Sequence, residues 1–340
     1  MVDNAQISKP PSRSQRLFDT SFRGLCCIFA WLSILLVVFI VLRIGAAALP
    51  AMGQYGFGFL TGTTWDPNTG QFGILPEIWG TLYTSLLAVF IGTSFGIAAA
   101  IFLSEGFLGQ FLFQILKVFN LHLRPAWTTL PDRVESLLRN LIELLAAIPS
   151  VVYGLWGLFV VIPLVRPVCI WLNLKMGWIP FFGTTLTGPG VFPAVIVLSI
   201  MILPTITAVS RDALVAVPSK LRMAAYGMGA TRWETILAVI LPTAARGLVG
   251  AVILAFGRAL GETMALAMLV GNANRISLSL FSPANTLAAL LANNFPEAAK
   301  KDVGVLMYAA LILLAITLFV NIIGSFILQR ASVGLEGGKQ

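Results

Sequence analysis

The sequence predicts an all-α fold with six membrane-spanning helices, and composition and backbone chemistry support this prediction. Hydrophobic residues make up 58% of the 340 residues, only 11% of the residues are charged, and the mean hydropathy is +0.90. An ordinary soluble chain is about 25% charged, so this chain lacks the polar residues needed to coat a soluble domain. Backbone groups in lipid must pair within their own segment, which favours helices over open strands.

The same composition excludes two other classes of protein. Intrinsic disorder needs low hydrophobicity and high net charge. A nucleic-acid-binding protein would gather its basic residues on one soluble surface. No nucleic-acid partner is therefore expected, and the lipid bilayer is the expected environment.

Six apolar runs are long enough for a helix to cross hydrocarbon, which takes about 20 residues. These predicted spans cover residues 24–49, 78–104, 137–163, 191–216, 244–270 and 303–328. Residues 1–23 are expected to form an N-terminal tail and residues 331–340 a C-terminal tail. Residues 78–330 would form a core of five helices, preceded by the first span.

The distribution of Lys and Arg predicts how the bundle is oriented. Fifteen of the 22 lie in the N-terminal tail, in residues 105–139, in residues 211–246 and at the C-terminus, and five lie in the alternate loops. Positively charged loops stay in the cytoplasm. We therefore expect a multi-pass membrane protein with both termini cytoplasmic, and the net charge of +8 follows from this topology.

Two further apolar stretches are expected to lie on the membrane surface. Residues 106–119 are short and contain Lys117, and residues 168–186 contain Lys175 and a Gly-Trp-Ile-Pro break. Inserting either stretch alone would turn the positive charges of residues 211–246 outward. The first run is expected to remain as an uncleaved span, because it is too long for a signal peptide.

Cysteine and histidine provide no metal-binding pattern. Cys26 and Cys27 are adjacent, Cys169 is isolated, and His122 is the only histidine. This spacing matches no metal site. The cysteines are expected to behave as small apolar residues.

Residues 217–243 form a polar segment with helical composition on the predicted cytoplasmic side. One helix is expected to begin after Pro218 and to break at the glycines around Gly229. Thr231 and Glu234 have the spacing of a capping box, which would start a second helix. Two interpretations stay open from the residues alone: a rigid corner that docks into a partner, or an amphipathic connector on lipid headgroups.

Within this segment, several spaced residues resemble the signature of the permeases of ABC importers, namely Ala224, Ala225, Gly229, Val239, Leu241 and Pro242. Met223 stands where that family's signature has Glu. The resemblance implies the MetI-like architecture of type I importers and a coupling helix held by an ATP-binding subunit. The expected coupling residues are Ala224, Ala225, Gly229, Thr231, Arg232, Glu234, Leu241 and Pro242.

Two further motifs resemble the phosphate-specific permeases of the PstC type. They are the Gly-Arg-Ala-Leu-Gly-Glu-Thr-Met run from Gly257 to Met264, followed by Gly271 and Asn272, and the Ile-Pro-Ser-Val-Val-Tyr-Gly run from Ile148 to Gly154. The resemblance implies half of a translocation path for inorganic phosphate. The implied partners are a PstA-type permease, a dimer of PstB-type ATP-binding subunits and a PstS-type periplasmic binding protein. The alternatives are a PstA-type identity or another oxyanion, sulfate or molybdate.

Arg258 and Glu262 are charged residues within a predicted span, and such residues are functional candidates. Four positions separate them, so on one helix they would pair. The pair either pins helix packing or binds the anion, because the Arg fork matches two phosphate oxygens. Thr263 and Ser150 are further candidate donors along the path.

Three other local features lead to expectations. Glu143 and Arg139 are spaced for a local ion pair. Asn272 is expected to cap the outer end of its span. Residues 286–295 resemble the short external helix of the permease family, which would either cover the path or pack against the ends of the spans.

No phosphate-binding loop of the form G-x-x-x-x-G-K-[ST] occurs in the chain, so no ATP hydrolysis and no cofactor is expected in it. ATP would bind to a partner subunit. A membrane-embedded enzyme acting on lipid phosphate is a weaker alternative, because the chain has one His and no acidic metal cluster. A non-catalytic scaffold is a third possibility.

Overall fold

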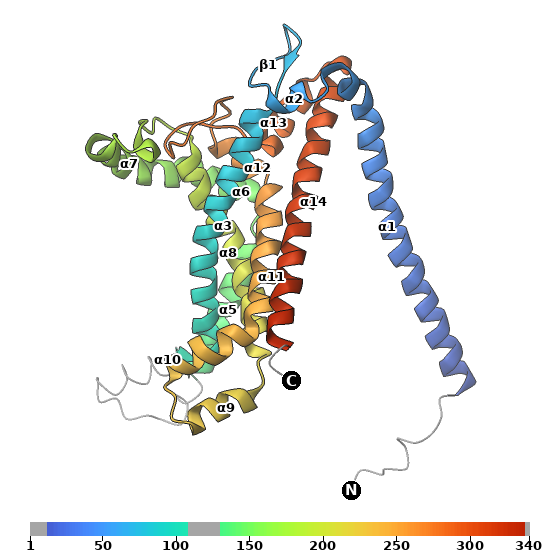
Figure 1. The fold of residues 1–340 in the computed structure, drawn as a ribbon, viewed down its shortest axis with the longest axis vertical. Coiled ribbons are helices and arrows are strands. Elements are labelled where there is room, and N and C mark those ends of the chain that lie inside the picture. Colours follow the sequence, from blue (N-terminus) through green and yellow to red (C-terminus); the bar gives the residue numbers. More distant parts are fainter. Residues whose placement is uncertain (1–11, 108–129, 337–340) are drawn as a thin grey trace.

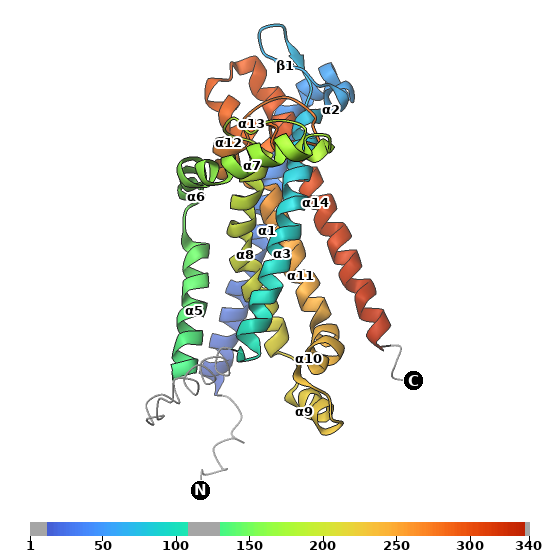
Figure 2. The ribbon, with the colours of Figure 1, turned by 90° about the vertical axis from the view of Figure 1, so that its left-hand side faces the viewer.

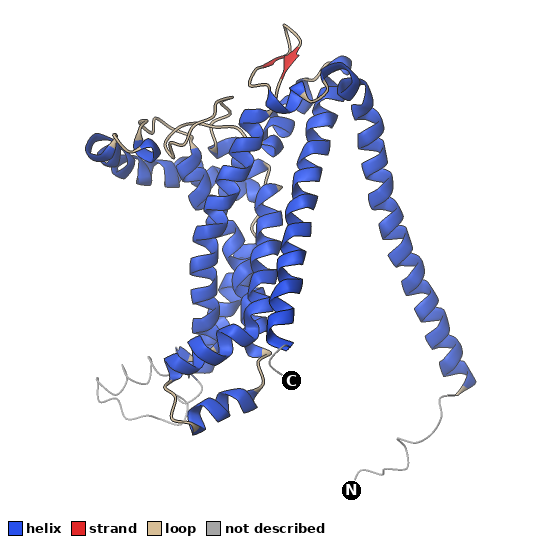
Figure 3. Cartoon of the chain, viewed as in Figure 1, coloured by secondary structure: helices blue, strands red, loops and turns tan. Residues whose placement is uncertain are grey.

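The computed structural model describes residues 12–107 and 130–336, and most of these residues are helical (Figure 3). The first half contains α1 (Arg13–Tyr55), α2 (Gly58–Thr61), β1 (Trp65–Asp66), β2 (Gln71–Phe72), α3 (Leu75–Ser104), α5 (Leu130–Ala147), α6 (Ser150–Trp156) and α7 (Ile162–Met176). The second half contains α8 (Val191–Val215), α9 (Ser219–Gly227), α10 (Arg232–Thr235), α11 (Leu241–Leu260), α12 (Met264–Leu269), α13 (Leu287–Asn294) and α14 (Lys300–Glu336).

Six helical stretches of the described chain are long and apolar enough to cross a membrane: Arg13–Tyr55, Leu75–Ser104, Ser150–Met176, Val191–Val215, Arg232–Leu260 and Asp302–Gln329. The all-α prediction is confirmed, and five of these stretches overlap predicted spans over most of their length. Helix α1 begins at Arg13, within the predicted N-terminal tail. Helix α14 continues to Glu336, within the predicted C-terminal tail.

The predicted span 137–163 is wrong as a single helix. Helix α5 ends at Ala147, and α6 begins after Pro149. Proline has no N–H and crowds the preceding turn, so it interrupts the helix. Helix α5 runs along the bundle, whereas α7 lies across one end of it (Figure 2). This crosswise orientation agrees with the surface position expected for residues 168–186, whereas most of the stretch 106–119 lies outside the described residues.

The two ends of the bundle differ in what they carry (Figure 1). One end, here the α9 end, holds α9, α10 and both chain termini. The other, here the hairpin end, holds the antiparallel pair β1–β2, α7 and α13. At the tip of the hairpin the Asp66 carboxylate accepts hydrogen bonds from Asn68 N–H and Thr69 Oγ1, both at 2.9 Å. These bonds lower the pKa of the Asp66 carboxyl.

Helix α1 leans away from the bundle along most of its length (Figure 1). It meets α14 near the hairpin end, where Ala48 and Ala51 are buried. The close approach uses Gly304, where an added Cβ would lie 3.3 Å from the Ala47 carbonyl oxygen. Most other apolar side chains of α1 are exposed. A helix that is apolar all round is suited to lipid.

Helices α3 and α8 pack at the centre of the bundle through small residues. A Cβ at Gly96 would lie 2.7 Å from Ile206 Cγ2, so only glycine permits this approach. Thr207 Oγ1 donates to the Gly96 carbonyl at 3.3 Å, and Ser199 Oγ donates to the Ala88 carbonyl at 3.2 Å. Small residues and interhelical hydroxyl bonds are the usual means of helix association in lipid.

Two short π-helical turns come directly before a helix with proline as its second residue. They are Gly157–Val161, before Pro163, and Ile236–Ile240, before Pro242. A proline leaves the carbonyl four residues earlier without its usual donor. The wider turn relieves this crowding, and Thr243 Oγ1 donates to the nearby Val239 carbonyl at 2.6 Å. The chain therefore passes from α10 into α11 without a break.

Candidate functional site

Arg258 lies in the last turn of α11, where this helix faces α8. The residue is exposed, and its Nη1 donates to Thr205 Oγ1 of α8 at 3.4 Å. Within the part of the chain that the structure describes, this is the one hydrogen bond of the Arg258 side chain. Since a guanidinium carries five N–H donors, most of its capacity is open to an anion.

The predicted ion pair between Arg258 and Glu262 is wrong for this structure. The ion pairs among described residues are Arg139–Glu143, Arg211–Asp212 and Arg222–Glu105. Helix α11 ends at Leu260, and the next two N–H groups bond to carbonyls three residues back. This tightening removes Glu262 from the helical register in which it would meet Arg258. Both residues still lie at the junction of α11 and α12.

The two predicted hydroxyl donors lie on neighbouring elements. Thr263 precedes α12, and its Oγ1 donates to the Gly261 carbonyl at 3.1 Å, as a hydroxyl in a membrane helix commonly does. Ser150 is the first residue of α6 and is partly buried. Helix α6 packs against α12 through Gly154, where a Cβ would lie 3.3 Å from Ala265 Cα. The contact between α6 and α12 thus brings the Ile148–Gly154 motif next to the Gly257–Met264 motif.

The break at Pro149 is stabilised by a tyrosine of the same motif. Proline cannot donate to the Leu145 carbonyl, which lies four residues earlier. Tyr153 Oη donates to that carbonyl at 2.8 Å. The α5–α6 bend is thus held by a residue of its own motif.

The predicted corner between the fourth and fifth spans is confirmed. Helix α9 covers Ser219–Gly227 after Pro218, and Gly229 has φ +86°, a conformation that favours glycine. Thr231 and Glu234 form the predicted capping box: Thr231 Oγ1 accepts from Glu234 N–H, and Glu234 Oε2 accepts from Thr231 N–H at 2.7 Å. The second helix continues through Leu241 and Pro242 into α11.

The corner is attached to the bundle by an ion pair that the sequence did not indicate. Arg222 Nη1 bonds to Glu105 Oε1 at 2.5 Å, and Arg222 Nη2 donates to the Leu214 carbonyl at 2.8 Å. Only 20% of the Arg222 side chain and 5% of the Glu105 side chain are exposed. This pair, here the α9 clip, joins α9 to the ends of α3 and α8. More than a hundred residues separate its members, so no local pattern predicts it.

A second contact holds the start of α10. The Arg232 guanidinium carbon lies 4.2 Å from the centre of the Phe107 ring, within cation–π range. Phe107 also stacks on Trp233, with ring centres 5.4 Å apart. Arg222 and Arg232 are therefore both held by contacts within the protein, which favours the rigid-corner interpretation of this segment over the amphipathic connector.

The tip of α9 presents apolar side chains to the surroundings. Met223 and Met228 are 71% and 84% exposed, and Tyr226 is also exposed. Ala225 is buried against the bundle, whereas Ala224 is exposed. Exposed apolar groups gathered on one short helix indicate a binding surface.

The hairpin end contains a buried carboxyl that the sequence analysis did not identify. Glu77 is fully buried, and its Oε1 accepts from Asn285 Nδ2 at 3.4 Å. Its Oε2 has no hydrogen-bond partner among the described residues. Asn285 also donates to Asn274 Oδ1, so the group links α3 to the loop before α13. The only sequence signal was an acidic residue directly before a predicted span.

Other expectations at this end are confirmed. Residues 286–295 contain α13, and Thr286 caps it by accepting from Ala289 N–H at 3.2 Å. The buried Leu287 and Leu290 pack with α1 and α14, which favours the packing interpretation of this helix. Asn272 caps α12 by donating to the Ala267 carbonyl at 3.0 Å.

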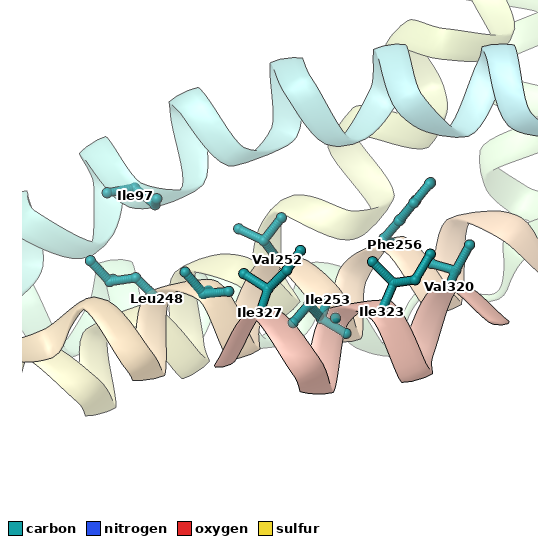
Figure 4. A pocket seen from close by; sticks show the side chains of 10 residues that line it. Ile97, Leu248, Val252, Ile253, Phe256, Val320, Ile323 and Ile327 are labelled. Atoms are coloured by element: carbon teal, nitrogen blue, oxygen red, sulfur yellow. The ribbon is translucent and has the colours of Figure 1, made fainter. Parts of the chain in front are cut away.

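Two cavities differ sharply in chemistry. A groove of about 410 Å³ between α3, α11 and α14 is lined by apolar residues (Figure 4): Ile97, Leu248, Val249, Val252, Ile253, Phe256, Val320, Ile323, Gly324 and Ile327. Such a lining does not suit an anion. A small cavity of about 50 Å³ between α5 and α8 is lined instead by charged residues, including the predicted Arg139–Glu143 pair, which is confirmed at 2.9 Å.

Metal chemistry finds no support in residues 12–107 and 130–336, which contain no group of three or more His, Cys, Asp or Glu placed to hold an ion. Cys26, Cys27 and Cys169 are free, and only Cys169 is buried.

A bundle of long apolar helices, with Arg258 between α8 and α11 and the α9–α10 corner at one end, defines the class as an integral membrane protein. The chain belongs to the family of binding-protein-dependent transport system inner membrane components, whose pattern matches residues 125–333.

Within this family, the chain is similar to phosphate permeases. It is 38% identical over 328 residues to the phosphate transport system permease protein PstC of Mesorhizobium japonicum, with 93% of this chain and 92% of that protein covered. It is 37% identical over 325 residues to the PstC protein of Haemophilus influenzae, with 93% and 95% covered. The resemblance drawn from the motifs is thus confirmed. Both relatives are named as permeases.

Solved structures show the same fold at low identity. A bacterial alginate ABC transporter, solved with an alginate pentasaccharide-bound periplasmic protein, matches with a TM-score of 0.57 at 16% identity, covering 92% of this chain and 96% of that chain. The inward-facing MetNI methionine ABC transporter matches with a TM-score of 0.51 at 19% identity, covering 79% and 99%. The predicted ABC-importer permease architecture is therefore confirmed.

Proposed function

We propose that this chain is a permease subunit that imports inorganic phosphate and forms half of the translocation path. The observation that carries the proposal is the similarity to PstC-named permeases along nearly the whole chain. The proposed path residues are Arg258, Glu262, Thr263 and Ser150.

Arg258 supplies the main attraction for the anion. Its planar fork matches two phosphate oxygens, and its exposed position between α8 and α11 leaves that fork accessible. Glu262 lies past the helix break, where its negative charge opposes tight binding of an anion. A conduction site must release its ion, so this opposition favours transport.

The corner at the α9 end couples the path to ATP hydrolysis in partner subunits. The exposed tip of α9 would dock on a dimer of PstB-type ATP-binding subunits, and the α9 clip would pass their motion to α3 and α8. The proposed coupling residues are Ala224, Ala225, Gly229, Thr231, Arg232, Glu234, Leu241 and Pro242, of which the buried Ala225 would position the others. The chain itself holds no cofactor, since ATP binds to the partner.

The Lys and Arg distribution supports a cytoplasmic α9 end and cytoplasmic termini in a bacterial inner membrane. The hairpin end would then face the periplasm and receive a PstS-type phosphate-binding protein. A PstA-type permease would supply the other half of the path.

Reconstitution of the four components in proteoliposomes tests the proposal through uptake of labelled phosphate. Arg258→Ala is expected to lower uptake by about a hundredfold, because two charge-assisted hydrogen bonds are lost, and Arg258→Lys should restore little. Arg166→Ala, an exposed residue of α7, is the matched control and should retain uptake. Unchanged phosphate uptake by Arg258→Ala would contradict the proposed path, and faster uptake of sulfate than of phosphate would favour the other-oxyanion alternative.

A further inference from the structure

We infer that the small cavity between α5 and α8 is a second anion site, in which Arg211 and Arg139 receive a tetrahedral oxyanion at the α9 end of the path. The inference rests on the proposed function, which supplies the anion. It adds a binding site separate from Arg258.

The cavity has two guanidinium groups on its walls. Its volume is about 50 Å³, and α3, α5 and α8 form it. Its polar lining consists of Arg139, Glu143, Thr207, Arg211 and Asp212. Arg139 projects from α5 and Arg211 from α8, so the two helices present positive charge to the same space.

The acidic groups at the cavity neutralise the two arginines unequally. Glu143 binds Arg139 at 2.9 Å. Asp212 is 3.7 Å from Arg211 Nη1, beyond hydrogen-bond distance, and its side chain is 77% exposed. Arg211 therefore has the weaker carboxylate partner of the two.

The Arg211 side chain has unused donors. It is only 20% exposed, and its Nε is buried without a hydrogen-bond partner among the described residues. A buried donor without an acceptor is costly, so a ligand rich in acceptors is favoured there. A tetrahedral oxyanion offers several oxygens, and guanidinium groups bind such oxygens in pairs.

One face of α8 joins this cavity to the Arg258 site. Thr205, the acceptor for Arg258, is followed on the same face by Ala208 and Asp212, at helical spacing of three and four residues. Ala208 is exposed along this face. Arg211 lies six positions beyond Thr205, which is a rise of about 9 Å in a helix. An anion released by Arg258 would need only a short movement along α8 to reach Arg211.

Charge-selective labelling tests the site without measuring transport. The experiment uses the full transporter in inside-out vesicles, with Ala208→Cys introduced into this chain. The exposed Cys26 and Cys27 are changed to Ser so that they do not react, and the buried Cys169 is kept. An anionic methanethiosulfonate should modify position 208 about tenfold faster than a cationic one, because the arginines concentrate anions. Inorganic phosphate should slow this reaction, and adding Arg211→Gln should remove both effects. Equal rates for the two reagents, or no protection by phosphate, would overturn the site.

Phosphate uptake provides the second measurement. Arg211→Gln should lower the maximal rate of phosphate uptake several-fold, whereas the external phosphate concentration that gives half-maximal uptake should not change. Arg211→Lys should retain more of the maximal rate. Arg133→Gln removes a charge from an exposed position of α5 and should leave uptake near that of the wild type. Wild-type rates in Arg211→Gln would overturn the role in transport. If phosphate protects position 208 but Arg258→Ala transports normally, the proposed path fails while the second site stands.

Discussion

At the scale of single residues, one close backbone contact requires a glycine, because any side chain at that position would clash. Gly80 of α3 lies against the backbone of Asn285, and a Cβ there would clash with the Asn285 carbonyl oxygen. Asn285 in turn binds the buried Glu77. One glycine therefore fixes where the loop before α13 meets α3.

Gly80→Ala is expected to destabilise the protein. Neither backbone can yield easily, so the cost should be about 1 to 3 kcal/mol, as for overpacked cores. Gly250→Ala on α11 is the matched control, because no atom lies within 4 Å of its added Cβ. That control should be neutral or stabilising, since alanine favours helices. Midpoints of thermal unfolding in detergent provide the comparison, and equal midpoints for the two variants would contradict the contact.

The Arg258 and Glu262 positions show what residue spacing does and does not predict. A spacing of four implies a pair only while the helix continues. Gly261 ends α11 between them, and Arg258 instead contacts Thr205 on another helix. The functional candidates were identified by their charge within an apolar run, whereas their partners required the packed bundle.

At the scale of elements, the corner formed by α9 and α10 was the most predictable feature. Its signals are local: Pro218, Gly229, and the capping box of Thr231 and Glu234. Its attachment was not predictable, because the α9 clip joins residues far apart in the chain. The clip ties the corner to the ends of α3 and α8.

Arg222→Ala is expected to uncouple the transporter. Removing one member of a largely buried ion pair leaves the other charge unpaired, at a cost of about 3 to 5 kcal/mol when burial is complete. Phosphate uptake should therefore fall more than ATP hydrolysis does. Lys220→Ala, an exposed change on the same helix, is the control. The measured quantity is the ratio of phosphate moved to ATP hydrolysed, and an unchanged ratio in Arg222→Ala would show that the clip does not transmit motion.

The third predicted span shows that hydropathy and length alone do not predict where a helix is interrupted. Residues 137–163 have the right length and hydropathy, yet Pro149 divides them between α5 and α6. Proline within an apolar run marks either a kink or a break, and local sequence does not distinguish these outcomes. Two of the charged residues of α5, Arg139 and Glu143, pair with each other and line the small cavity beside α8.

At the scale of the whole molecule, the two ends are chemically different. Among the described residues, the α9 end carries the start of α1, the end of α14 and most of the Lys and Arg, and the hairpin end carries β1–β2, α7 and α13 (Figure 1). The loop charges predict that the α9 end is the cytoplasmic one.

Both termini are expected to be accessible from the cytoplasmic side. Protease-cleavable tags at residue 1 and residue 340 should both be cut in inside-out vesicles and both be protected in right-side-out vesicles. An odd number of crossings would instead expose one tag in each preparation. A tag in the loop between β1 and β2 should show the opposite pattern and serves as the control.

The sequence by itself determined the all-α membrane class, most spans, the corner of α9 and α10 and the candidate Arg258. These features follow from hydropathy, from residues that start or end helices, and from charge, all of which can be seen in a short stretch of chain. Only the tertiary structure decided the break at Pro149, the isolation of Glu262 from Arg258, the α9 clip, the burial of Glu77 and the small cavity that Arg139 and Arg211 both line. Each of these depends on contacts between distant segments or on how a helix ends against its neighbours, and such contacts leave no periodic signal in the chain.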